Sequence, residues 1–167
     1  GMGIEPLVAQ AHGAGERAAA RTWLWQGGAL GVLLGLPLVL VCVLVPLAFE
    51  LTGIAADLAG VSSVYIYGRL PGVLVMGVLA AQRAFLSSTG RQWAVLLAVA
   101  VANVVNLALD VGLVLGRWGL PKLGALGTAL ATSASMVLMV VLMAVAIARR
   151  PLPVAEDSRV RRQADPA

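Results

Sequence analysis

Residues 22–49 read TWLWQGGALGVLLGLPLVLVCVLVPLAF and contain no charged side chain. About 20 apolar residues suffice for a helix to cross the hydrocarbon core of a membrane, so this stretch of 28 can span it. Three similar runs follow: the only charge within 58–82 is Arg69, the only charge within 92–116 is Asp110, and 123–148 has none. Lipid offers the backbone no hydrogen-bond partner, so each run is expected to be helical. We predict an all-α, antiparallel transmembrane bundle with spans at about 22–48, 58–86, 92–116 and 123–148.

The composition of the chain agrees with a membrane location. Its 167 residues are 60% hydrophobic and 12% charged, with a mean hydropathy of +0.92. Soluble domains carry about 25% charged residues, and disordered chains are far less hydrophobic. The net charge of +4 does not indicate nucleic-acid binding, because the basic residues lie in loops and in the tail. The single cysteine, Cys42, excludes a disulfide framework.

The two ends of the chain differ from the spans. Residues 1–10 are too short to cross a membrane, and we interpret them as the end of a preceding helix whose beginning is missing. Residues 1–148 therefore form the predicted membrane domain, and the chain is expected to be a natural fragment or a trimmed piece of a longer protein. Residues 149–167 are predicted to be a solvated, disordered tail, with a lipid-binding patch as the alternative.

Charge in the loops predicts the orientation. One side of the bundle carries nine Lys and Arg residues and the other carries two, with Arg69 left out. Positive charge marks the cytoplasmic side of a bacterial inner membrane, which places the loops at 13–21 and 87–91 and the tail there. The four tryptophans lie at the ends of the runs, where interfacial aromatic belts occur: Trp23, Trp25, Trp93 and Trp118.

Small residues repeat every four positions on two spans. Gly27, Gly31 and Gly35 lie on the first. Gly124, Thr128 and Thr132 lie on the last, beside Ala125, Ala129 and Ser133. This spacing lets helix backbones approach closely. We interpret it as packing within the bundle, and dimerisation is the alternative.

Asp110 is the one acidic residue well inside an uncharged run. A charged side chain at the membrane centre costs roughly 2.5–3.5 kcal/mol on insertion scales, so it indicates a function. Asn103 and Asn106 precede it at a spacing that places all three on one helix face. Carboxylate and amide oxygens can hold a proton or a hard cation such as Na⁺. The alternative is a structural Asp110 that is hydrogen-bonded to a neighbouring helix.

Other polar groups give weaker signals. Arg69 lies inside its span and either extends to the membrane surface or lines a polar cavity. Tyr65 and Tyr67 fall on opposite sides of a helix, so at most one faces the interior. Polar residues near the ends of the runs are expected to be solvated: Gln26, Gln82, Arg83, Ser87 and Ser88. The sequence has no glycine-rich phosphate loop, no Cys/His cluster and no Ser/His/Asp set, so we expect neither an enzyme nor a cofactor.

Several stretches together resemble the multidrug and toxic compound extrusion (MATE) transporters of the NorM type. The resemblance covers about residues 3–148, and its most specific part is the last block. The matching stretches are 6–17 (PLVAQAHGAGER), 25–27 (WQG), Tyr65, 83–86 (RAFL), 89–91 (TGR), 103–110 and 119–132 (GLPKLGALGTALAT).

The resemblance implies part of the amino-terminal lobe of an exporter that exchanges small organic compounds for H⁺ or Na⁺. In that family the cation site of this lobe uses an Asn and an Asp on the fifth helix, which match Asn106 and Asp110. A Thr on the sixth helix matches Thr128, and a Tyr on the fourth matches Tyr65. Asn103 and Arg69 are possible additional lining residues. The family's first helix, with its acidic residue, and its second lobe have no counterpart in this chain.

Two other functions stay open. One is a flippase of the same superfamily for lipid-linked sugars or polysaccharides, for which a more cationic cavity than Arg69 alone provides is expected. The other is a membrane interaction module or fragment that transports nothing. The expected partners are small organic substrates, membrane lipid, and the missing first helix and second lobe of the transporter.

Overall fold

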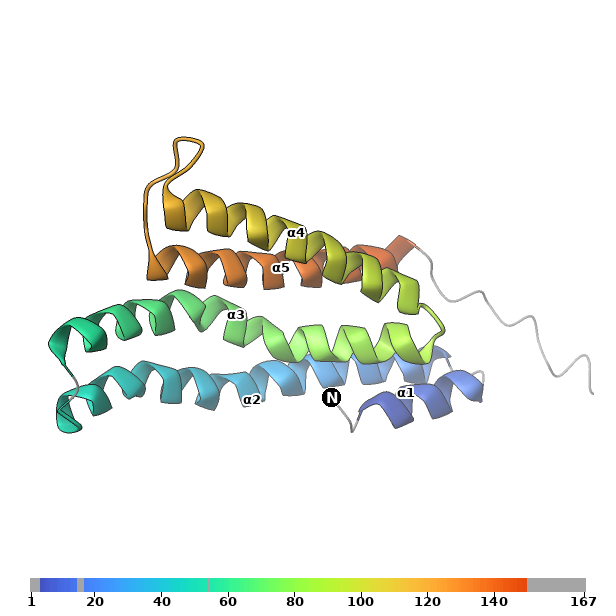
Figure 1. The fold of residues 1–167 in the computed structure, drawn as a ribbon. Coiled ribbons are helices and arrows are strands. Elements are labelled where there is room, and N and C mark those ends of the chain that lie inside the picture. The colour runs from blue at the N-terminus through green and yellow to red at the C-terminus, as the bar shows by residue number, and fades with distance from the viewer. Residues whose placement is uncertain (1–3, 15–16, 54, 150–167) are drawn as a thin grey trace, which may run out of the picture.

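A computed structural model describes residues 4–14, 17–53 and 55–149 of the chain. Within these residues the structure consists of helices joined by short connections, with no strand (Figure 1). The helices are α1 (Ile4–Gly13), α2 (Arg17–Leu51), α3 (Ala56–Ser88), α4 (Gln92–Leu115) and α5 (Ala125–Arg149). The predicted all-α class is therefore confirmed, and a helix also forms in the first segment.

Four of these helices are long and apolar enough to span a membrane. They correspond to the four predicted spans, and α4 begins at the predicted residue. Helix α2 begins five residues before the predicted span, because Arg17–Arg21 contains three consecutive alanines, the residue with the highest helix propensity. Pro37 and Pro46 lie inside α2 without ending it. Residues 150–167 of the predicted tail lie outside the described residues.

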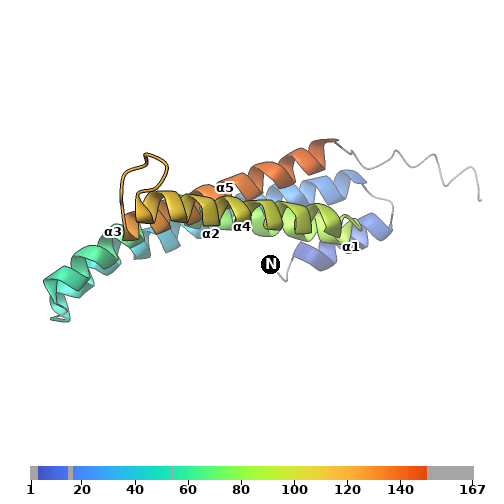
Figure 2. The same cartoon turned by 45° about the horizontal axis from the view of Figure 1, so that its top comes forward.

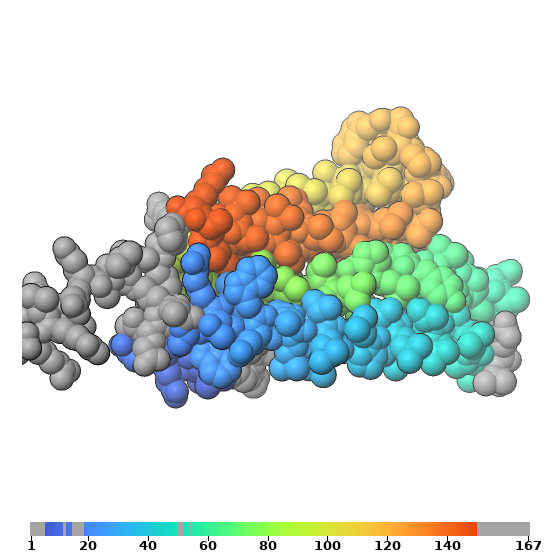
Figure 3. Space-filling view, turned by 180° about the vertical axis from the view of Figure 1, so that it is seen from behind, coloured from blue at the N-terminus to red at the C-terminus, as the bar shows by residue number. Residues whose placement is uncertain are grey.

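The spans form a row in which chain order is not kept. Helix α2 packs on α3, α3 on α5 and α5 on α4, so that α5 lies between two helices that are consecutive in the chain (Figure 1). Helix α4 lies in front of α5 in Figure 2, and α5 lies in front of α4 in the reverse view of Figure 3. Helix α3 changes direction near its middle, and Pro71 lies in its interior.

Two helix–helix interfaces depend on glycine residues, which have no side chain. A Cβ atom on Gly77 of α3 would lie 2.3 Å from the Cα of Gly31 on α2, so the two backbones touch. Between α3 and α5, a Cβ on Gly68 would lie 2.7 Å from the Cβ of Ala129. The hydroxyl of Ser133 donates a hydrogen bond of 2.9 Å to the carbonyl oxygen of Gly68.

These small residues therefore form helix contacts within the bundle, as the first interpretation of their spacing predicted. On α5, the residues that meet α3 are Ala129 and Ser133, which belong to the predicted set of small residues beside Thr128 and Thr132.

The outer surface of the row is apolar. Leucine and valine side chains along α2 and α4 are exposed, as lipid-facing side chains are in a protein without its membrane. Trp25, Trp93 and Trp118 are more than two-thirds exposed near helix ends, consistent with the predicted interfacial belt. Cys42 is half-buried and unpaired.

Candidate functional site

Asp110 lies on α4, about one and a half turns before the helix ends at Leu115. The residue is half-buried, and its carboxylate oxygen Oδ1 is buried without a hydrogen-bond partner. One turn earlier, the side-chain nitrogen Nδ2 of Asn106 is also buried without a partner. Buried polar groups are nearly always paired in folded proteins. Two unpaired groups on adjacent turns therefore mark a place where a further partner would be favourable.

The contact between α4 and α5 fixes the depth of Asp110 along α5. A Cβ on Gly127 would lie 2.8 Å from the carbonyl oxygen of Leu113, so the two antiparallel helices touch there. Asp110 precedes Leu113 by three residues, and its level on α5 is therefore about three residues after Gly127. That level lies between Thr128 and Thr132, which are both half-buried. The hydroxyl of Thr132 donates to the carbonyl oxygen of Thr128 at 2.8 Å.

The contact between α3 and α5 places Arg69 at the same depth. Gly68 lies against Ala129, and α3 and α5 run in the same direction. Arg69 follows Gly68 by one residue, so it is level with the residue after Ala129. Its side-chain nitrogen Nη1 is buried without a partner. Tyr65 lies one turn further toward the outer end and is 39% exposed.

These side chains share one face of the row. On α4, Ala98, Ala102 and Leu113 form the stripe toward α5, and Asp110 lies about a quarter turn from it. On α3, Arg69 lies about a quarter turn from the glycines that meet α5. Thr128 lies between the sides of α5 that meet α3 and α4. Helices α3 and α5 run in the same direction and α4 runs opposite to them. The side chains of Arg69, Asp110 and Thr128 therefore project from the same side of the row.

We call this side the polar face. It comprises Tyr65, Arg69, Asn106, Asp110, Thr128 and Thr132. The structure thus places the four residues of the predicted cation site on one face, with Asn106, Asp110 and Thr128 within about one turn of a common depth and Tyr65 one turn outward. Asn103 is exposed and lies farther around α4. Within the described residues, no hydrogen bond or ion pair joins the side chains of the polar face to one another.

Two polar residues behave in ways that sequence patterns did not indicate. Gln82 is only 7% exposed, and its Oε1 atom is buried without a partner, so the expectation that it is solvated is wrong. Helix α3 continues to Ser88, so Gln82 lies inside the helix and lines a groove between α2, α3 and α5. Gln26, Arg83 and Ser87 are exposed, as expected, and Ser88 is half-buried.

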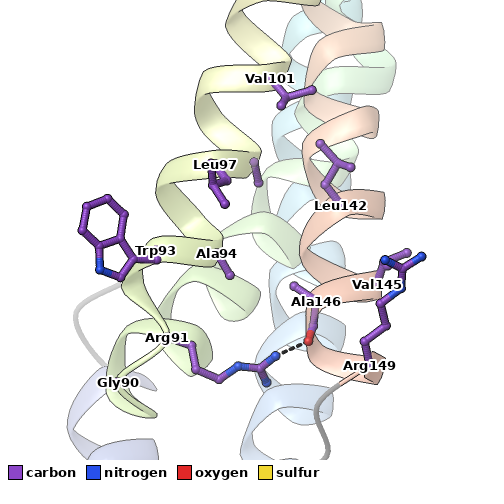
Figure 4. A pocket seen from close by; sticks show the side chains of 11 residues that line it. Gly90, Arg91, Trp93, Ala94, Leu97, Val101, Leu142, Val145, Ala146 and Arg149 are labelled. Atoms are coloured by element: carbon purple, nitrogen blue, oxygen red, sulfur yellow. Dashed lines mark hydrogen bonds between the residues drawn. The ribbon is translucent and has the colours of Figure 1, made fainter.

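Arg91 has an unexpected structural role. Its guanidinium donates a hydrogen bond to the backbone carbonyl of Ala146, in the last turn of α5 (Figure 4). The last four carbonyls of a helix have no partner within it, and a cation there also complements the helix dipole. Arg91 and Trp93 lie at the mouth of a groove between α4 and α5 whose walls include Leu97, Val101 and Leu142. Only the fold brings Arg91 to Ala146, so no local sequence signal predicts this contact.

Comparison with known proteins identifies a family that this chain matches. The MatE family model matches residues 1–112. A probable multidrug resistance protein NorM of Pseudomonas aeruginosa is 35% identical over 155 residues, which is 87% of this chain and 30% of that protein. The corresponding NorM of Thermotoga maritima is 30% identical, over 78% of this chain and 28% of that protein. A probable multidrug resistance protein YoeA of Bacillus subtilis is 29% identical, over 97% and 35% respectively. The chain spans about a third of the length of these relatives.

Proposed function

Because the chain belongs to the MatE family of transporters, as a multi-pass protein of the inner membrane, we propose that it forms the cation-binding part of a multidrug antiporter. In this proposal the exported compounds are small organic molecules and the driving ion is H⁺ or Na⁺. Asp110 is the residue that binds the ion. Its buried, unpartnered carboxylate oxygen is the single observation that carries the proposal.

The neighbours of Asp110 supply the remaining ligands. Asn106 lies one turn away, and rotation of its amide directs an oxygen instead of a nitrogen toward the ion. Thr128 provides a hydroxyl from α5, and Tyr65 provides a phenol from α3. One carboxylate with neutral oxygens suits an ion of charge +1, because binding cancels the charge of the site. Oxygen ligands are those that hard cations prefer.

Loading the site changes the balance between helix arrangements. A carboxylate without a partner is costly in the membrane interior, and binding a proton or Na⁺ removes that charge. An arrangement that closes apolar surface over Asp110 is therefore more favourable when the site is loaded. An ion that binds two arrangements with different affinity shifts their populations, which is the requirement for alternating access.

The test measures the carboxylate directly. The purified chain is placed in lipid nanodiscs, and the infrared band of Asp110 is assigned as the carboxylate signal that disappears in Asp110→Asn. We expect this band to respond to Na⁺ at constant pH or, without Na⁺, to pH. Asn103→Ala is the matched control, because its exposed side chain lies on the same helix. A band that responds to neither ion would refute the cation site.

A transport assay distinguishes the alternatives. In a NorM-type transporter that contains this sequence, Asp110→Asn is expected to abolish cation-driven export of a cationic dye at normal expression. Export of the dye at the unmodified rate would refute coupling through Asp110. Movement of a lipid-linked sugar instead of the dye would indicate a flippase. Vesicles containing only residues 1–167 are expected to show no substrate-dependent cation flux, since the chain covers a third of its relatives.

A further inference from the structure

We propose that the groove between α4 and α5 binds one anionic phospholipid of the cytoplasmic leaflet. Its phosphate lies at Arg91 and Arg149, and one acyl chain lies between the two helices. The groove has a volume of about 660 Å³. Leu97 and Val101, which line it, lie roughly half a turn around α4 from Asp110, so the groove opens on the side away from the polar face. The proposal is therefore independent of the cation site.

The mouth of the groove carries two positively charged side chains. Arg91 immediately precedes α4, and its guanidinium donates to the carbonyl oxygen of Ala146 on α5. Arg149 follows Ala146 by three residues, and positions three apart are neighbours on one face of a helix. Both arginines line the groove, and Figure 4 shows them at the same end of it. Among the described residues that line the groove none is acidic, so its mouth is positive.

A lipid phosphate suits this mouth. Guanidinium groups bind phosphate oxygens through paired, charge-assisted hydrogen bonds. Charge in the loops predicts that this end of the bundle is cytoplasmic, and basic pockets between transmembrane helices on that side bind anionic headgroups. Trp93 is 75% exposed beside the mouth, as a tryptophan at the headgroup level of a membrane is (Figure 4).

The walls of the groove suit an acyl chain. They are apolar on both helices and comprise Ala94, Leu97, Val101, Leu142 and Val145. From Trp93 to Val101, α4 rises about 12 Å. Half of the hydrocarbon core of a membrane is about 15 Å thick. The groove therefore extends from the headgroup level through most of one leaflet, with its charge at one end only, as in a phospholipid.

Two other occupants fit the groove less well. A second copy of the chain related by a two-fold axis would bring its own arginines to Arg91 and Arg149, because such an interface pairs a surface with itself. A soluble protein would have to enter the hydrocarbon region to contact Leu97 and Val101. An anionic lipid meets neither obstacle, since it complements the charge and already lies in the membrane.

The experiment measures lipid binding to the purified full chain in detergent. The chain is titrated with phosphatidylglycerol and, in parallel, with phosphatidylcholine that has the same acyl chains, and native mass spectrometry counts the bound molecules. We expect one phosphatidylglycerol per chain. Each arginine near an anionic lipid contributes a factor of about 5 in affinity, so two give a preference of about 25-fold over phosphatidylcholine. Equal affinity for the two lipids would overturn the proposal.

Charge variants test the mouth. Arg149→Gln, at an exposed position, is expected to weaken phosphatidylglycerol binding about fivefold without changing phosphatidylcholine binding. Arg149→Lys is expected to keep most of the preference. Arg83→Gln is the matched control, because it removes the same charge from an exposed position on α3 outside the groove. Equal losses in Arg149→Gln and Arg83→Gln would show that net charge alone attracts the lipid, and would refute the site.

A wall variant tests the acyl chain separately. Val101→Trp fills the inner part of the groove and is expected to weaken binding of both lipids. Leu107→Trp, exposed on the same helix and outside the groove, is expected to leave binding unchanged. Unchanged binding in Val101→Trp would contradict the proposal. So would a parent chain that binds no phosphatidylglycerol, in which case a second copy, visible as a dimer in the same spectra, or residues 150–167 would be the occupant.

Discussion

Replacing Gly77 with alanine tests the contact between α2 and α3 quantitatively. The new Cβ would lie 2.3 Å from the Cα and carbonyl carbon of Gly31 and 2.6 Å from its carbonyl oxygen, whereas real Cβ atoms essentially never come closer than 3.0 Å. The obstacle is backbone, so no change of rotamer relieves it. The two helices must therefore separate by roughly 0.7 Å or more, and a gap of about 0.5–1 Å forfeits a quarter to a half of each dispersion contact across the interface.

The expected cost follows from these contacts. Overpacking a close-packed interface costs about 1–3 kcal/mol, and alanine also raises helix propensity by about 0.8–1.0 kcal/mol relative to glycine. Gly60→Ala on the same helix controls for propensity, because a Cβ there meets nothing within 4 Å. We expect Gly77→Ala to have a free energy of unfolding about 1–3 kcal/mol below that of Gly60→Ala. The assay is unfolding of the purified chain by SDS in detergent micelles, followed by helicity. Equal stability of the two variants would show that the backbones do not touch.

Three further substitutions test other contacts. Ser133→Ala removes the hydrogen bond to the carbonyl of Gly68, and we expect a loss of about 0.6–1.7 kcal/mol in the same SDS titration. An unchanged midpoint would contradict that bond. Arg91→Ala removes the donor to Ala146, so the last turn of α5 is expected to exchange its amide hydrogens faster, with a cost of about 0.3–1 kcal/mol. Exchange confined to other segments would argue against this role. Gly116 has φ 70°, in the left-handed region, so Gly116→Ala is expected to cost about 1–2 kcal/mol in thermal unfolding. A gain in stability would show that this backbone conformation is not adopted.

The positions of the membrane spans could be predicted from the sequence, because charged side chains are costly in lipid and are rare within spans. The four apolar runs between Thr22 and Ala148, two without charge and two with a single charged residue, correspond to α2 to α5. Helix neighbours could not be predicted, since the apolar side chains of α2 and α4 occupy all sides and no stripe indicates the packing partner. The position of α5 between α3 and α4 depends on the glycine and serine contacts, which appear only in three dimensions.

Part of the candidate site could be predicted from the sequence, because a charged residue inside an apolar span is rare. Asp110 was recognisable as an isolated carboxylate in a span, and Asn106 as its neighbour one turn away. The common depth of Arg69 and Asp110 was not, because it requires the registers of two helix contacts, at Gly68 and at Gly127. Gln82 was expected to be solvated because it is the last residue of the apolar run 58–82. Helix α3 continues beyond this run to Ser88, so Gln82 lies inside the helix.

The position of α5 imposes an order on biogenesis. Helices α3 and α4 are joined by the short segment 89–91, and both leave the ribosome before α5. Helix α3 already has α2 as a neighbour at that stage, whereas α4 packs chiefly against α5. Until α5 has been inserted, Gly68, Gly72 and the α5-facing side of α4 lack their partner. A cell that stops translation before residue 125 therefore holds a hairpin with two unsatisfied surfaces, which membrane chaperones and proteases recognise. Insertion of α5 therefore decides whether α3 and α4 are kept.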